Sequence, residues 1–164
     1  MKVKLIYEKF ISHILVKKGV NKVDKEINKK ITVRTTVNVN VKEVWEYWTK
    51  PVHIIKWNQA SDDWCTSFAE NDLRLGGRFL YKMEAKDKSD GFDFSGTYGE
   101  VEPFKRISYT LDDGRGVIIG FKTKDNQTEI EEVFEADESH SLERQQQGWQ
   151  SIFNQFKRYA EFMV

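Results

Sequence analysis

The sequence predicts an α+β fold in which a curved antiparallel sheet of about seven strands wraps around a long C-terminal helix. Two patterns predict it. Apolar and polar residues alternate over residues 31–39 and again in several later segments, which are divided by Gly91, Pro103, Gly114 and Asn126. These divisions are 11 or 12 residues apart, the spacing of an antiparallel meander. The residues after Ser141 instead carry apolar side chains at helical spacing.

The first strand follows from the period-two alternation over residues 31–39. Asn40 stands three residues before Glu43, a spacing typical of a capping box, so a short helix should begin there. Pro51 ends this helix and suits the first turn of the next one. The sequence therefore predicts two short helices directly after the first strand.

About six further strands should follow Ser61, each with one apolar, aromatic face and one mostly polar face. Ser141 is a suitable N-cap for the final helix. The apolar stripe of this helix consists of Trp149, Ile152, Phe153, Phe156, Tyr159, Ala160 and Met163. Such a stripe needs a partner surface, and only the concave face of the sheet is large enough.

The charge divides the chain into two parts. The 26 basic and 26 acidic residues balance, but residues 1–30 hold nine Lys and only three acidic residues, so they carry +6 and residues 31–164 carry −6. We expect residues 1–30 to form a basic N-terminal extension, with a short amphipathic helix and a linker, and residues 31–164 to form the domain. The extension either packs loosely or touches a membrane surface or an acidic partner.

Several classes of protein are disfavoured. The net charge of zero gives no field that would attract nucleic acid, and the aliphatic stretches are too short for a transmembrane segment. The single cysteine, Cys65, cannot form an intramolecular disulfide, which favours a reducing, cytoplasmic location. The three histidines and Cys65 have unrelated spacings, so we expect neither a metal nor a cofactor.

Two short motifs have structural explanations. Gly76 and Gly77 lack the lysine of a phosphate-binding loop and are expected to form a tight turn into a strand. Ser139, His140 and Ser141 stand at a helix start, where capping explains them without a catalytic role.

Several motifs occur in one order along the chain. They are residues 48–58, residues 61–64, residues 71–79, residues 96–98 with Pro103, residues 106–115, and Gln145 with Gly148 and Trp149. Together they resemble bacterial proteins that are named as similar to the activator of the heat-shock protein 90 ATPase. The resemblance covers about residues 31–162. It implies the START-like (SRPBCC, Bet v-type) helix-grip fold, whose members enclose hydrophobic ligands such as lipids, sterols and polyketides between sheet and helix.

A cavity of this kind should be lined by inward-facing strand residues and by the facing stripe of the helix. The candidate ligand-binding residues are Met83, Phe94, Tyr98, Ile119 and Phe121 on the sheet, Trp149, Phe153 and Phe156 on the helix, Trp57 and Trp64 as a rim or lid, and the polar Glu132 and Gln145. The rings favour a flat or aromatic ligand, although the same rings can simply fill the core.

Glu132 breaks the apolar pattern because it shares the inward alternation of Ile130 and Phe134. A buried carboxylate costs several kcal/mol unless it is paired or protonated, and such costs are often retained for function. Glu132 is therefore the one weak catalytic candidate, as a general base, or else it accepts a ligand hydrogen bond. A bulge that turns it outward and a salt bridge at the sheet end are the alternatives. Gln145 is either a second polar contact or a solvated helix residue.

Three functions remain open. A binding or carrier module for a small hydrophobic or aromatic molecule comes first, because the chain holds no clear catalytic constellation. A protein-interaction role, like that of a co-chaperone, is what the family name implies. An enzyme that acts on a cyclic hydrophobic substrate through Glu132 or Tyr98 is the third.

Overall fold

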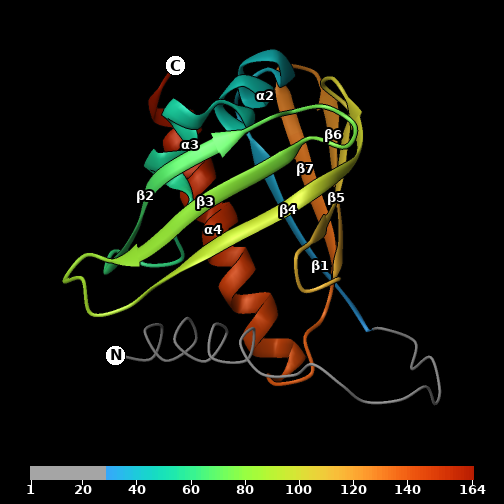
Figure 1. The fold of residues 1–164 in the computed structure, drawn as a ribbon. Helices are drawn as coiled ribbons and strands as arrows, with labels where there is room; N and C mark the ends of the chain where they lie inside the picture. The colour runs from blue at the N-terminus through green and yellow to red at the C-terminus, as the bar shows by residue number, and fades with distance from the viewer. Residues whose placement is uncertain (1–28) are drawn as a thin grey trace.

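The computed structural model describes residues 29–164, so the amphipathic helix predicted near the N-terminus lies outside the described residues. The elements in chain order are β1 (Lys30–Val37), α2 (Val41–Thr49), α3 (Pro51–Trp57), β2 (Trp64–Asn71), β3 (Arg78–Ala85), β4 (Gly91–Glu102), β5 (Arg106–Leu111), β6 (Gly116–Lys124), β7 (Gln127–Glu135) and α4 (Leu142–Phe162). Figure 1 shows the strands curving around α4. The predicted α+β architecture is thereby confirmed.

The sheet is an antiparallel meander of six strands, to which the first strand of the chain is added at one edge. Its seven strands follow the order β1-β7-β6-β5-β4-β3-β2, and every pair is antiparallel. Strands β2 to β7 pair with their sequence neighbours, while β1 crosses over to pair with β7. This order makes β1 and β2 the two edges of the sheet.

The predicted helix caps are present. The side chain of Asn40 accepts hydrogen bonds from the backbone N–H groups of Lys42 and Glu43, at 3.1 Å each. Pro51 opens α3, and the Ser141 hydroxyl accepts from the N–H of Arg144 at 3.2 Å. The caps of α2 and α4 satisfy backbone donors that the first helical turn leaves without a partner, while the proline that opens α3 lacks such a donor. Local sequence therefore favours helix starts at these points.

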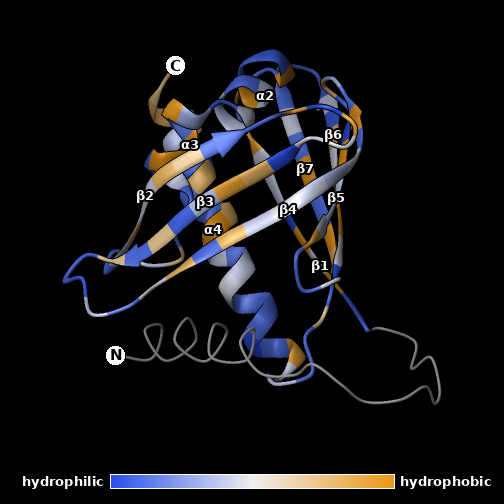
Figure 2. Ribbon diagram, in the orientation of Figure 1, coloured by the Kyte–Doolittle hydropathy of each residue, from blue (hydrophilic) through white to orange (hydrophobic). Residues whose placement is uncertain are grey.

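The apolar stripe of α4 lies in the concave face of the sheet (Figure 1). Phe153, Phe156 and Ala160 are at most 1% exposed. The rings of Trp48 and Trp57 meet Phe153 and Phe156 edge-on, at centroid distances of 5.4 and 4.9 Å. Figure 2 shows that the early turns of α4 are mostly hydrophilic, and the fully buried apolar residues of this helix lie in its later turns. Met163, which was expected to extend the stripe, follows the helix end and is 44% exposed.

Two glycines permit close backbone approaches. A Cβ atom on Gly77 would lie 2.0 Å from the carbonyl oxygen of Asp72, which explains the tight turn into β3. A Cβ atom on Gly96 would lie 2.9 Å from the ring of Phe79 on the neighbouring strand. This glycine therefore lets the Phe79 ring lie across β4 and reach the space under α4.

The edge strand β1 is covered by side chains of α4. The Gln150 amide donates to the carbonyl oxygen of Arg34 at 2.9 Å and accepts from the N–H of Arg34 at 3.3 Å. The Gln146 amide donates to the carbonyl oxygen of Thr32 at 3.2 Å. Backbone groups that an edge strand would otherwise offer to another chain are thus occupied.

Candidate functional site

A cavity of about 100 Å³ lies between the concave face of the sheet and the first half of α4. Arg144 is the exposed member of its lining, so the cavity meets the surface at the start of α4. An apolar cavity of about 150 Å³ accepts benzene, whereas pockets for larger ligands measure about 300–1,000 Å³. A single-ring compound would need small side-chain shifts here, and a sterol would need a large rearrangement.

The cavity wall is mainly aromatic. Its aromatic members are Trp48, Trp57, Phe79, Tyr81, Phe92, Phe94, Tyr98, Tyr109, Trp149 and Phe153. On the helix side, the Trp149 ring stacks on Phe134 of β7 with centroids 4.2 Å apart and an angle of 20° between the planes. Trp149 also meets Phe94 edge-on at 6.1 Å. These contacts hold the indole against the wall, leaving a rigid surface for a flat ligand.

A chain of hydrogen bonds crosses the part of the wall nearest α2. Tyr81 donates to Tyr98, the Tyr98 hydroxyl donates to the Asn71 side chain at 2.6 Å, and the Asn71 amide donates to the carbonyl oxygen of Thr49 at 2.7 Å. Burial raises the pKa of Tyr98 to about 12 and that of Tyr81 well above its usual range. Both hydroxyls therefore stay protonated, and their donors are used within the protein.

Glu132 points inward from β7 and is only 2% exposed. Among the described residues, its Oε1 atom has no hydrogen-bond partner. Burial raises the pKa of this carboxyl group to about 8. The pairing of Glu132 with Val33 and Ile119 keeps its strand in register, so no bulge turns the side chain outward. Within residues 29–164 it forms no salt bridge either. The carboxyl group is thus a neutral, unsatisfied polar group in the cavity near pH 7.

Tyr109 lies near Glu132 on the same wall. Burial and the nearby Glu132 both raise the pKa of Tyr109 well above its usual range. The tyrosine borders the cavity and so keeps some accessible surface, but protein surrounds it on the other sides. Its hydroxyl group is therefore a donor at any physiological pH.

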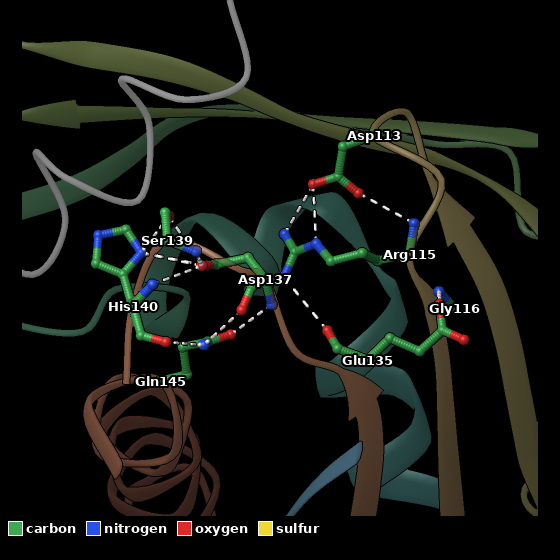
Figure 3. A network of polar contacts seen from close by, with 8 residues as sticks. All are labelled: Asp113, Arg115, Gly116, Glu135, Asp137, Ser139, His140 and Gln145. Carbon is green, nitrogen blue, oxygen red and sulfur yellow. Dashed lines mark hydrogen bonds and ion pairs between the residues drawn. The ribbon is translucent and has the colours of Figure 1, made fainter. Parts of the chain in front are cut away.

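The segment between β7 and α4 is fixed by the buried amide of Gln145 (Figure 3). This amide accepts from the N–H of Asp137 at 2.8 Å and donates to the carbonyl oxygens of Asp137 and His140, at 3.2 and 2.9 Å. Gln145 is 2% exposed, so it is not a solvated helix residue. Its hydrogen bonds position the segment beside the cavity opening.

Asp137, Ser139 and His140 resemble a catalytic triad in composition but not in geometry. Ser139 Oγ and both Asp137 oxygens approach the same ring nitrogen, His140 Nδ1, at 2.8 and 3.2 Å (Figure 3). A triad needs the serine and the carboxylate on opposite ring nitrogens. Burial alone would raise the pKa of Asp137, but hydrogen bonds from Ser139 and the neighbouring His140 lower it. The three residues therefore form a turn that leads into α4.

Nine of the twelve candidate residues line the cavity: Trp57, Met83, Phe94, Tyr98, Ile119, Glu132, Gln145, Trp149 and Phe153. Trp64, Phe121 and Phe156 do not. Trp64 is fully buried beside Phe92 instead of forming a rim or lid. Phe121 packs against Trp45 and Trp48, and Phe156 against Trp57, so these rings belong to the core.

The cavity wall also includes residues that were not predicted to line it: Trp48, Thr49, Asn58, Asn71, Phe79, Tyr81, Phe92, Ile107, Tyr109, His140, Arg144, Gly148 and Ile152. Strand alternation does place Tyr81 and Tyr109 on the inward face, so that signal was present. Asn71 and Thr49 stand at the ends of separate elements, and only folding brings them together.

Residues 29–164 contain neither a cluster of metal ligands nor a membrane-spanning helix. No group of three or more His, Cys, Asp or Glu side chains in this range is placed to hold a metal ion. Within the same residues, no helix combines the length and the apolar character needed to cross a membrane.

Comparison with known structures supports the same architecture. The AHSA1-like protein from Aeromonas hydrophila is 43% identical, with a TM-score of 0.79 over 82% of this chain and 94% of that one. Protein Chr148 from Cytophaga hutchinsonii is 47% identical, with a TM-score of 0.72 over 82% and 93% of the two chains. Protein CV1439 from Chromobacterium violaceum, at 21% identity and a TM-score of 0.73 over 81% and 98%, shares the fold.

No curated protein matches the chain. The family described as Activator of Hsp90 ATPase homolog 1-like protein matches residues 38–161, a range that contains α2 to β7 and nearly all of α4. The fold and the structural neighbours agree with the START-like helix-grip architecture that the sequence motifs imply. The chain therefore belongs to the Activator of Hsp90 ATPase homolog 1-like family.

Proposed function

We propose that the domain binds a small apolar compound, preferably one with an aromatic ring, in the cavity between the sheet and α4. One observation carries the proposal: an aromatic cavity contains a carboxyl group that the protein leaves without a hydrogen-bond partner among residues 29–164. A fully packed core would fill that space, because protein interiors leave few voids larger than a water molecule.

The preference for binding over catalysis rests on the arrangement of polar groups. Tyr98, a candidate for catalysis, donates its hydroxyl hydrogen to Asn71 and is held in a chain of hydrogen bonds. Among the described residues, Glu132 Oε1 has no partner that would orient the carboxyl group as a base. An apolar wall with a few polar contacts is typical of a ligand pocket.

NMR shift mapping of the full chain tests the proposal. The panel contains single-ring aromatic compounds, a medium-chain fatty acid and a sterol. Trp57 and Trp149 line the cavity, so their indole N–H signals report its occupation. We expect saturable shifts at these signals with single-ring compounds and weaker ones with the sterol, because the cavity volume is about 100 Å³.

A matched pair of variants localises the binding. Ile119 lines the cavity, while its neighbour Ile118 on β6 is 39% exposed on the opposite face. Ile119→Phe should fill the cavity and abolish the shifts, whereas Ile118→Phe should leave them unchanged. Thermal unfolding checks that both variants fold, since overpacking costs about 1–3 kcal/mol. Saturable shifts that survive in folded Ile119→Phe would place binding elsewhere and refute the proposal.

A further inference from the structure

Hydrogen-bonding capacity is unevenly distributed over the cavity wall. Tyr98 and Asn71 use their donors within the chain that ends at Thr49, and Gln145 is fully engaged by the segment before α4. In the described part of the chain, Glu132 Oε1 alone among the oxygens that line the cavity is buried without a partner. A polar ligand atom at this point would form a hydrogen bond that the protein by itself leaves unmade.

The sheet register brings a second group beside Glu132. Ile107, Ile119 and Glu132 form one row across β5, β6 and β7, and Tyr109 belongs to the next row on the same face. Glu132 contributes to the raised pKa of Tyr109, while no hydrogen bond does. The Glu132 carboxyl group and the Tyr109 hydroxyl group therefore border the same part of the cavity.

Both groups carry a proton near pH 7. Burial raises the pKa of Glu132 to about 8 and the pKa of Tyr109 well above its usual range. A carboxyl group kept neutral by an apolar site acts as a hydrogen-bond donor. The other titratable groups that line the cavity are Tyr81 on β3, Tyr98 on β4, His140 before α4 and Arg144 on α4. None of them contributes to the shift at Glu132, which is due to burial.

We propose that the cavity selects neutral single-ring aromatic compounds that carry a carbonyl oxygen, to which the Glu132 carboxyl and the Tyr109 hydroxyl both donate. A carbonyl oxygen has two lone pairs and so matches two donors. The inference rests on the proposed function and adds a chemical class to it. An organic cation matches less well, because Glu132 would first have to lose its proton.

Three compounds of nearly the same shape test the ligand class. Acetophenone carries the carbonyl group, α-methylstyrene replaces C=O by C=CH₂, and 1-phenylethylamine is a cation at pH 7. Their affinities for the full chain are measured by NMR titration. We expect acetophenone to bind about tenfold more tightly than α-methylstyrene, the sum of two ordinary hydrogen bonds.

The outcomes separate the two proposals. Equal affinities for acetophenone and α-methylstyrene, or tightest binding of the amine, would overturn the ligand class and leave the cavity function standing. The same holds if all three compounds fail while another member of the wider panel binds. Failure of every compound would overturn the proposed function as well.

Two variants and the pH dependence of acetophenone affinity identify the hydrogen-bond donors. Tyr109→Phe should weaken acetophenone binding about threefold, because it removes one of the two hydrogen bonds. It should leave α-methylstyrene binding unchanged, which checks that the cavity is intact. In the wild type, acetophenone affinity should fall by about threefold above pH 8 and then level off, because ionisation of Glu132 removes one of the two hydrogen-bond donors. Glu132→Gln keeps an N–H donor, so it should bind acetophenone without that pH dependence. Persistence of the full dependence in Glu132→Gln would overturn the assignment of Glu132.

Discussion

Gln145 and Glu132 line the same cavity and are equally buried, at 2% exposure, yet their surroundings differ. The Gln145 amide makes three hydrogen bonds to the backbone of the segment before α4. Oε1 of Glu132 has none among the described residues. Burial alone therefore does not tell what a polar residue does. A satisfied group holds the fold together, while an unsatisfied one costs stability and remains available to a ligand.

The largest expected effect is a loss of stability with rising pH that depends on Glu132. Its pKa is raised from 4.5 to about 8 in the folded protein, so the folded state binds the proton more tightly than the unfolded chain. The contribution to stability is full below pH 4.5 and is lost as pH rises to 8. We expect the free energy of unfolding to fall by about 1.4 kcal/mol per pH unit across most of this window.

Urea unfolding from pH 5 to pH 8 measures this slope, and Glu132→Gln is the matched variant. Histidines contribute equally to both proteins, so the difference between the two slopes belongs to Glu132. Parallel slopes would mean that Glu132 ionises normally in the folded state, and the contrast with Gln145 would disappear.

The next effect concerns Gln145. Gln145→Met keeps the length of the side chain but removes all three hydrogen bonds to the backbone of Asp137 and His140. We expect a loss of about 2–4 kcal/mol in the free energy of unfolding. Gln147→Met is the control, because Gln147 is exposed and its amide donates only to Glu143 at 3.3 Å. A loss no larger than in this control would show that Gln145 is not structural.

The smallest expected effects on stability distinguish Tyr98, which is hydrogen-bonded within the protein, from Tyr109, which has no hydrogen bond among the described residues. Tyr98→Phe removes the hydrogen bond to Asn71 and the acceptor of Tyr81, so it should cost about 1–2 kcal/mol. Tyr109→Phe removes a hydroxyl that makes no hydrogen bond in the described residues, and it should cost less than about 0.5 kcal/mol. Thermal unfolding distinguishes the two. Equal losses would show that Tyr109 also has a structural partner.

Local sequence rules predicted where two of the helices begin and which residues of a strand point inward. Asn40 and Ser141 cap their helices as expected because capping depends on residues within one turn. The inward position of Glu132 also followed from strand alternation, which is a local property. These features needed no knowledge of distant contacts.

The details of the site depend on packing between distant elements. Phe121 shares the inward alternation of Ile119, but the indoles of Trp45 and Trp48 on α2 cover its ring and remove it from the cavity. The burial of Gln145 requires the segment before α4 to fold back over it. Periodicity gives the direction of a side chain but not the neighbour that it meets, so the boundary between core and cavity could not be predicted.

The glutamines that α4 places along β1 have a consequence for self-association. Gln146 and Gln150 occupy backbone groups of Thr32 and Arg34, so another chain that paired with this part of the edge would have to displace these side chains. Helix α4 follows all seven strands along the chain, so it can cover the β1 edge only after the whole sheet has been synthesised. A nascent chain offers that edge for intermolecular pairing until α4 docks, so a chain that ends before Leu142 should aggregate more readily than the full chain.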